Sequence, residues 1–433
     1  MTITQAETEM FEGAVDRGVF DALARGVRSF DLLVASLPGV YPSTVLHSLQ
    51  RLESAQKISA KVWTALVKSA QEMREPLNDS YHLIGLPIPH PLDYDWRFSD
   101  STVQHLLNEC AALTRQGDAI ALLGTPSLLR MGIEQSYPRQ LILLEANRAV
   151  TDIFAQTIPA PQVFRCDVMR DTLPHLTAKA VVLDPPWYPE HIQSFLWAAC
   201  QLCKIGGYIL ISMPPVGTRP GIEREWANTL DWAQHIGLTL VKLELATLSY
   251  VTPPFELNGL RAEGLHAVSR DWRRSDLAVF SRTHQTKVPR PTVQQQQDFW
   301  QEEVLGGVRF RVRNPNLSSF ADPSLMSIVP GDVLQSVSRR DSHRQLADVW
   351  TSGNRIFACR GRGVLWQILR AVTVGRSPVE TVASALGHPL SLVEAELVSR
   401  TTDRIANIIS TEQKENLFFG EQHNNRRQSL ATG

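Results

Sequence analysis

The residues with the clearest chemical potential are Asp184-Pro185-Pro186-Trp187, which directly follow the apolar run Ala180-Val181-Val182-Leu183. Such a run predicts a buried parallel strand, and open α/β sheets bind their ligands where these strands end. Asp184 offers a carboxylate that accepts hydrogen bonds, the prolines fix the backbone without donating N–H groups, and Trp187 offers a flat face for a ring. We expect this corner to align a substrate amine. The alternative is a rigid turn whose tryptophan packs in the core.

Apolar runs alternate with helical segments between Ala119 and Ser281, which predicts a parallel, doubly wound α/β sheet. The predicted strands are 119–123, 140–144, 162–165, 180–183, 207–213, 238–245 and 277–280. A helix is expected over residues 190–203. Its Cys200 and Cys203 are expected to be buried thiols, and no metal site is expected.

The Asp-Pro-Pro-Trp sequence resembles the D/N-P-P-Y/F/W motif of S-adenosylmethionine-dependent amino-methyltransferases, and the seven predicted strands resemble the Rossmann-like class I methyltransferase fold. The resemblance implies methylation of an exocyclic amine, foremost that of adenine or cytosine in nucleic acid. Asp184 and the carbonyl of Pro185 would accept the amine hydrogens, with Pro186 completing the stiff corner. Trp187 would stack on the ring, and a base in a duplex would have to leave the helix stack.

The same resemblance implies where S-adenosylmethionine binds. Gly124 and Thr125 lie in the loop that wraps the cofactor, Glu145 would accept from the ribose hydroxyls, and Asp167 would meet the adenine amino group. The alternatives are a helix N-cap for Glu145 and an Asx-turn for Asp167. The loop departs from the usual acid-x-Gly-x-Gly, because it has a single glycine followed by Pro126, which leaves less room for the backbone to approach a ligand.

A second resemblance, to branched-chain polyamine synthases, is carried by the N-terminal helices, the Leu-Gly-x-x-x-Leu loop at residues 123–128 and the Asp-Pro-Pro sequence. Those enzymes use decarboxylated S-adenosylmethionine and keep several acids in that loop, where this chain has Thr125, Pro126 and Ser127. A polycationic amine needs carboxylates to offset its desolvation, so aminopropyl transfer is the second hypothesis. A third hypothesis is a catalytically degenerate DNA-binding or scaffold subunit of a modification or defence complex.

Further substrate contacts are expected from aromatic residues and arginines around the sheet's edge. These residues are Trp96, Arg97, Phe255, Arg273 and Arg274. The segment 86–100 is rich in proline and aromatic residues and could form a lid or wall over the site, or a strap packed by its own rings. The alternative for the two later arginines is solvation or pairing with Asp271 and Asp276.

The N-terminal residues 1–80 are expected to form a winged-helix-like domain with helices over 11–24, 30–37 and 45–52. The third of these helices carries only His47, Gln50 and Arg51 as polar contacts. This is a thin set for binding phosphates, so the domain could contact DNA, dimerise or pack on its neighbour.

A linker is expected at Gln294 to Gln297, inside a C-terminal domain of residues 286–433. Residues 305–374 contain ten arginines, four aspartates and neither lysine nor glutamate. The alternation Val308-Arg309-Phe310-Arg311-Val312-Arg313 places three arginines on one strand face. An arginine ladder without acidic partners suits a phosphate backbone. The alternative is neutralisation by Asp322, Asp332, Asp341 and Asp348 together with acids elsewhere. Helices over 364–374, 377–386 and 391–409 favour contacts with a protein partner or a second copy, and residues 412–433 are expected to be disordered.

Length and composition limit these hypotheses. A chain of 433 residues predicts two or three domains, here 1–80, a methyltransferase domain 81–285, and 286–433. A net charge of -1 excludes a uniformly basic nucleic-acid binder, although a local basic patch remains compatible with it. Five cysteines without disulfide spacing indicate a reducing compartment, and no apolar run is long enough for a membrane helix. We therefore expect a cytoplasmic enzyme.

Overall fold

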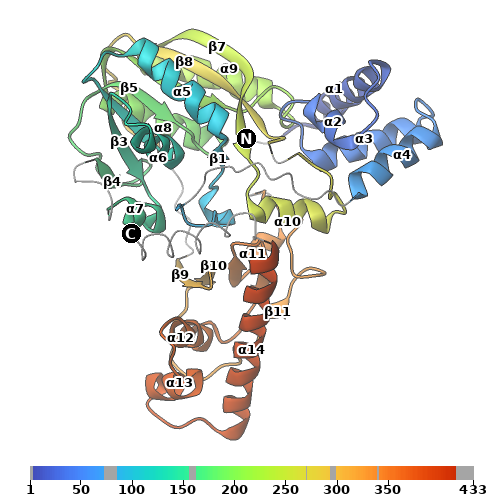
Figure 1. Cartoon of the computed structure of the whole chain (residues 1–433), viewed down its shortest axis with the longest axis vertical. Coiled ribbons are helices and arrows are strands. Elements are labelled where there is room, and N and C mark those ends of the chain that lie inside the picture. The colour runs from blue at the N-terminus through green and yellow to red at the C-terminus, as the bar shows by residue number, and fades with distance from the viewer. Residues whose placement is uncertain are drawn as a thin grey trace, which may run out of the picture. The chain divides into compact units, whose positions relative to one another are not determined.

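The computed structural model describes residues 3–72, 85–155, 162–269, 271–292, 299–338 and 341–415 (Figure 1). The chain forms two compact units, and each is assembled from separate stretches of sequence. The first unit contains Met1–Leu83, Trp96–Thr252 and Leu265–Gln294. The second contains Ile84–Asp95, Pro253–Gly264 and Gln295–Gly433. None of the helices in the described ranges is long and apolar enough to cross a membrane.

The first unit contains a sheet of eight strands in the order β1-β7-β8-β6-β5-β2-β3-β4. The strands are β1 (Arg97–Phe98), β2 (Ala119–Leu123), β3 (Gln140–Glu145), β4 (Val163–Arg165), β5 (Ala178–Leu183), β6 (Cys203–Met213), β7 (Leu238–Val251) and β8 (Arg274–Arg282). Strands β2 to β6 are parallel, whereas β8 runs antiparallel to both β6 and β7. The sheet is therefore mixed rather than wholly parallel. It has one strand more than predicted, because the short β1 pairs with the end of β7.

Helices cover both faces of this sheet, as the apolar runs require. Every residue of the stretches 120–123 and 180–183 is buried, so neither face of β2 or β5 is open to water. Helices α8 (Pro189–Leu202) and α9 (Ile222–His235) pack together against β5, β6 and β7. Helices α5 (Asp100–Leu113) and α6 (Pro126–Glu134) also pack together, and they contact β7 and β3. Helix α7 (Arg148–Ala155) packs beside β3 and β4.

The two cysteines at the end of α8 are buried and free, although Cys203 begins β6 and does not end the helix as predicted. Burial raises the pKa of the Cys200 thiol to about 11 and that of Cys203 to about 12. Both groups therefore remain protonated at neutral pH, which favours a structural role over metal ligation.

Four helices form the N-terminal part of the first unit. They are α1 (Gln5–Ala24), α2 (Phe30–Ala35), α3 (Pro42–Ser54) and α4 (Ala60–Gln71). Thr4 and Glu7 form a capping box at the start of α1, and the Ser59 hydroxyl caps α4. The fourth helix was not among the three predicted. Residues 3–72 contain no strand, and residues 73–84, where a wing would follow, lie outside the described residues. The winged-helix assignment stays a prediction.

The second unit contains a five-stranded sheet in the order β11-β13-β12-β10-β9. The strands are β9 (Trp300–Leu305), β10 (Val308–Arg313), β11 (Met326–Ser327), β12 (Val349–Thr351) and β13 (Ile356–Ala358). The helices are α10 (Pro254–Ala262), α11 (His343–Leu346), α12 (Arg362–Thr373), α13 (Pro378–Leu386) and α14 (Leu392–Glu415). Glu412 was expected in a disordered tail, but it belongs to α14 and its side chain is buried. The predicted linker at 294–297 and residues 416–433 lie outside the described residues.

Arg309 and Arg311 of β10 have acidic partners, contrary to the prediction of an unpaired ladder. Arg309 is 1% exposed, and its Nη2 lies 2.9 Å from Asp93 and 2.8 Å from Glu302. Arg311 pairs with the same two carboxylates at 2.6 and 2.7 Å, because Glu302 on β9 lies opposite it in register. Burial acts to raise the pKa of Asp93, but the charges of Arg311 and Arg309 hold it below its usual value. Two of the three arginines are therefore neutralised inside the unit.

Candidate functional site

Three neighbouring parallel strands of the first unit end side by side. Leu144 of β3 and Leu183 of β5 both lie in register with Leu123 of β2. Gly124 directly follows the end of β2, Asp184 directly follows the end of β5, and Glu145 is the last residue of β3. The carboxyl ends of adjacent parallel strands form the ligand-binding edge of an open α/β sheet. The structure therefore places the predicted corner and two predicted cofactor residues along one edge.

The carboxylate of Asp184 is held by a tyrosine that the sequence analysis did not single out. The hydroxyl of Tyr250 donates to Oδ1 of Asp184 at 2.6 Å. Oγ of Ser212 lies 2.5 Å from that hydroxyl and 3.1 Å from Oγ of Ser275. Trp187 joins the same group, because its indole Nε1 donates to Ser212 over 3.4 Å. One buried polar network thus links both functional ends of the Asp-Pro-Pro-Trp corner.

The electrostatics of this network keep Tyr250 as a donor. Burial, and next the negative charge of Asp184, raise the pKa of the tyrosine well above its usual value. The phenol therefore stays protonated at any physiological pH, and its single hydrogen fixes the orientation of the Asp184 carboxylate.

The face of Trp187 is covered by an arginine of the same unit. The guanidinium carbon of Arg273 lies 4.2 Å from the centroid of the Trp187 ring and 4.1 Å from that of Trp96. The Tyr250 ring is 6.0 Å from the same carbon. Two residues predicted to bind the substrate, Trp96 and Arg273, therefore meet the corner. The Arg273 guanidinium lies against the face of the Trp187 indole, which was expected to stack on a substrate ring.

Arg97, Arg274 and Phe255 were also predicted to bind the substrate. Arg97 is 3% exposed and its backbone pairs with Val251, so the guanidinium is not presented to solvent. Arg274 begins β8 and pairs with Asp271 at 3.3 Å, which matches the alternative given for it. Phe255 belongs to the second unit and is 1% exposed. Their roles in substrate binding stay predictions.

The loop between β2 and α6 has features of a ligand-binding loop despite its single glycine. Gly124 has a φ of +67°, a conformation that residues with a side chain rarely adopt. A Cβ atom there would also lie 3.8 Å from the carbonyl oxygen of Asp184. Thr125 is 2% exposed, and its hydroxyl has no hydrogen-bond partner in the part of the chain that the structure describes. A buried hydroxyl without a partner is costly, and a bound ligand would satisfy it.

The two predicted cofactor acids already accept hydrogen bonds from the backbone. Oε1 of Glu145 accepts from the Asn147 N–H at 2.8 Å, while Asn147 itself caps the next helix. Oδ1 of Asp167 accepts from the Met169 N–H at 3.0 Å, which is the Asx-turn given as its alternative. Each carboxylate is thus fixed in place and partly exposed at the edge of the sheet. Their contact with a cofactor stays a prediction.

Tyr250 was not predicted as a site residue because β7 is irregular. The predicted strand ended at residue 245, but β7 continues to Val251 past a register shift between Glu244 and Leu248. Ala246 has a φ of +53° at this bulge, where its N–H donates to Asp276 at 2.7 Å. The bulge interrupts the alternation that predicts a strand, and it directs the last residues of β7 toward the corner. Arg219, also missed, supports the corner by donating to the Trp187 carbonyl at 2.6 Å.

Comparison with known proteins supports the fold assignment. No protein-family model matches the chain, and no curated protein matches its sequence. Among solved structures, the chain is similar to a mutein of the branched-chain polyamine synthase from Thermus thermophilus, in complex with N4-aminopropylspermidine and 5'-methylthioadenosine. The TM-score is 0.51 and the identity 12%, over 67% of this chain and 95% of that chain.

Two further structures are similar at lower TM-scores. The branched-chain polyamine synthase from Thermus thermophilus gives a TM-score of 0.49 at 14% identity, over 67% of this chain and 95% of that chain. A TehB-like S-adenosylmethionine-dependent methyltransferase from Corynebacterium glutamicum gives 0.30 at 14% identity, over 43% of this chain and 90% of that chain. At 12% identity the likeness to the first of these structures concerns the fold alone, a mixed α/β sheet covered by helices.

Proposed function

We propose that the first unit transfers an alkyl group from a sulfonium cofactor of the S-adenosylmethionine type to an amine nitrogen. The leading form of this proposal is methyl transfer to the exocyclic amine of adenine or cytosine in nucleic acid. The observation that carries it is the Asp184 carboxylate, which Tyr250 holds at the end of β5, with the indoles of Trp187 and Trp96 packed edge to face with the Tyr250 ring.

The residues around Gly124 fit such a cofactor. The Thr125 hydroxyl would gain the partner that it lacks among the described residues, and the positive φ of Gly124 brings the backbone close to a ligand. Glu145 would accept from hydroxyl groups and Asp167 from an amino group, because carboxylates only accept. The complex of the structurally similar polyamine synthase with 5'-methylthioadenosine, a product of this cofactor class, is consistent with this arrangement.

The cofactor supplies an electrophilic carbon bound to positively charged sulfur, and the chain's residues align the amine with it. Asp184 would accept one amine hydrogen and the Pro185 carbonyl the other, so the nitrogen lone pair points at that carbon. Formation of the N–C bond would leave the bonding pair of the broken S–C bond on sulfur, and Asp184 would accept the surplus N–H proton. Alignment rather than strong acid catalysis would supply most of the acceleration.

Aminopropyl transfer to a polyamine is the second candidate, and one observation favours it. The guanidinium of Arg273 lies against both Trp96 and Trp187, so the aromatic walls beside Asp184 already stabilise a positive charge. A protonated amine would make the same contacts. The loop of Thr125, Pro126 and Ser127 contributes no carboxylate to neutralise a second or third charge.

The test supplies the purified chain with both cofactor and substrate pairs and detects products by mass spectrometry. One reaction contains methyl-labelled S-adenosylmethionine with single-stranded or duplex DNA or RNA, and the other contains decarboxylated S-adenosylmethionine with spermidine. Asp184→Asn should abolish product formation, whereas Asp231→Asn, an exposed carboxylate on α9, should not. Full activity of Asp184→Asn would refute the role of Asp184. The absence of both products and of cofactor binding in calorimetry would leave the non-catalytic hypothesis.

A further inference from the structure

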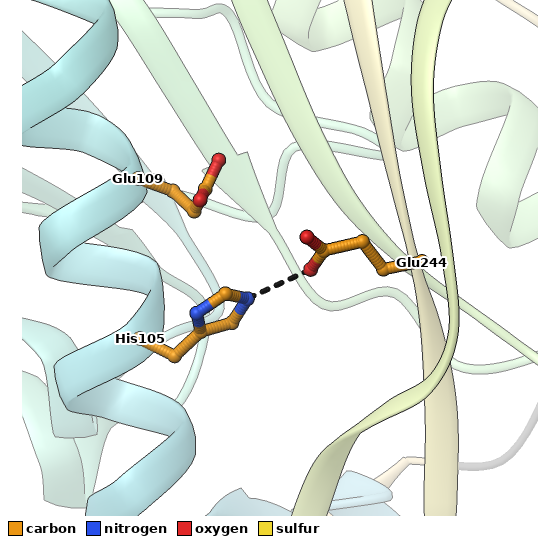
Figure 2. Close-up of side chains that lie close together, drawn as sticks. All are labelled: His105, Glu109 and Glu244. Atoms are coloured by element: carbon orange, nitrogen blue, oxygen red, sulfur yellow. Dashed lines mark hydrogen bonds and ion pairs between the residues drawn. The ribbon is translucent and has the colours of Figure 1, made fainter.

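A second cluster of chemically capable side chains lies between α5 and β7, and none of its members belongs to the candidate site. Figure 2 shows His105 and Glu109 on α5 pointing toward Glu244 on β7. The ligating atoms of the three residues all lie within 4.8 Å of one another, and His105 Nε2 is 2.8 Å from Glu244 Oε2. Imidazole nitrogen and carboxylate oxygen are both ligand types that bind zinc.

The backbone fixes the positions from which these ligands extend. His105 and Glu109 are four residues apart on α5, so they lie on one face of the helix. Glu244 immediately precedes the register shift of β7, and α5 packs against this strand. The side chains of His105 and Glu244 are 35% and 24% exposed, so water can reach the cluster and complete a coordination sphere.

A positive charge already lies at this cluster. Nζ of Lys242 is 2.9 Å from Glu109 Oε2 and 2.8 Å from Glu244 Oε1, so its ammonium group bridges the two carboxylates. These carboxylates raise the pKa of Lys242. Burial acts to raise the pKa of Glu244, but the hydrogen bonds from Lys242 and His105 lower it. The Lys242 side chain is 40% exposed and can therefore move into solvent.

We propose that His105, Glu109 and Glu244 bind a zinc ion, and that the ammonium group of Lys242 is the internal cation with which zinc competes. The bound ion joins α5 to β7, the strand that carries Tyr250 beyond its bulge. Zinc binding therefore stabilises the first unit whether or not the chain is a transferase.

Calorimetric titration of the full chain with zinc chloride tests the proposal, together with thermal unfolding in zinc and after chelation. We expect one zinc ion per chain and a higher unfolding temperature with zinc. His105→Ala and Glu244→Gln should each weaken binding at least tenfold, as removal of a metal-site group typically does. Lys242→Ala should strengthen binding roughly fivefold, because a competing unit charge in a half-exposed site disappears. Asn108→Ala, an exposed position on the same helix, is the matched control and should bind as the wild type does.

The Lys242 variant separates this site from adventitious binding, since zinc held by other histidines or by the buried cysteines would not respond to it. The proposal is overturned if saturable binding is absent in excess zinc, or if His105→Ala and Glu244→Gln bind as tightly as Asn108→Ala. Weaker binding by Lys242→Ala than by the wild type would overturn it as well. After chelation each variant should unfold at the wild-type temperature, which shows that the substitution itself has not destabilised the fold.

Discussion

Tyr250→Phe removes one oxygen atom from the centre of the candidate site and leaves the ring in place. In the wild type this hydroxyl donates to Asp184 at 2.6 Å and lies 2.5 Å from Ser212. A hydrogen bond to a charged acceptor contributes about 1.5–3 kcal/mol to stability, and the buried oxygens that remain lose a partner. We expect the free energy of unfolding to fall by about 2 kcal/mol. Urea unfolding at neutral pH measures this change.

The same substitution should reduce catalysis under the proposed function. Without its donor, the Asp184 carboxylate can rotate away from the orientation that accepts the amine hydrogen. Loss of one orienting hydrogen bond corresponds to a roughly 10- to 100-fold lower rate constant. We expect this loss in kcat, with little change in the KM for the cofactor, because Gly124 and Glu145 are untouched. Single-turnover transfer of the labelled alkyl group is the assay.

Tyr208→Phe is the matched control, since this tyrosine of β6 is partly exposed and its ring faces Lys179. It should retain activity and stability. The reasoning fails if Tyr250→Phe transfers the alkyl group at the wild-type rate while Asp184→Asn is inactive. An unchanged free energy of unfolding would show that the hydrogen bond to Asp184 contributes nothing.

Three further substitutions test other parts of the structure. Arg273→Ala should lower the free energy of unfolding by about 1–2 kcal/mol, because the cation–π contacts with Trp96 and Trp187 are lost. It should also lower the KM for the amine substrate. A higher KM would instead show that Arg273 binds the substrate. Burial raises the pKa of Glu412 from 4.5 to about 7, so the stability linked to its protonation is complete below pH 4.5 and lost as the pH rises through about 7. Glu412→Gln should therefore be more stable than the wild type by up to about 3 kcal/mol near pH 8 and equal to it near pH 4, measured by urea unfolding. Asp93→Asn leaves Arg309 and Arg311 with one carboxylate fewer and should destabilise the second unit by about 3 kcal/mol, with an unchanged melting curve as the contrary result.

The central parallel strands of the first unit, among them β2 and β5, were predictable because they are short, apolar and separated by helices. Residues 120–123 and 180–183 are buried on both faces, and this requirement leaves a continuous apolar signature in the sequence. Strand β1 has only two residues and carries no such signature. The end of β7 was missed because the bulge at Ala246 breaks the alternation, so the residue that orients Asp184 fell in a stretch assigned as irregular.

The arginines of β10 show that local periodicity predicts a strand but not the partners of its side chains. The alternation correctly predicted the strand at residues 308–313, but it contained no information about the acids that face it. Asp93 is 216 residues away from Arg309 along the chain and meets it only in the folded second unit. The cluster of His105, Glu109 and Glu244 could not be predicted for the same reason, since Glu244 lies 139 residues after His105. Pairings across such separations are decided by the tertiary fold.

The position of Arg273 distinguishes the two candidate reactions on physical grounds. A neutral base that stacks on Trp187 must displace a guanidinium, so it gives up cation–π contacts that it cannot itself replace. A protonated amine exchanges one cation for another and keeps those contacts. The difference is about 1–2 kcal/mol in favour of the cationic substrate, or a factor of roughly 5 to 30 in affinity. Arg273→Ala removes the same displacement cost for both substrates, so it should lower both KM values by a similar factor if both are accepted. The preference for the cation should persist in the variant, and the ratio of the two KM values, rather than of their changes, therefore reports which substrate the aromatic walls select.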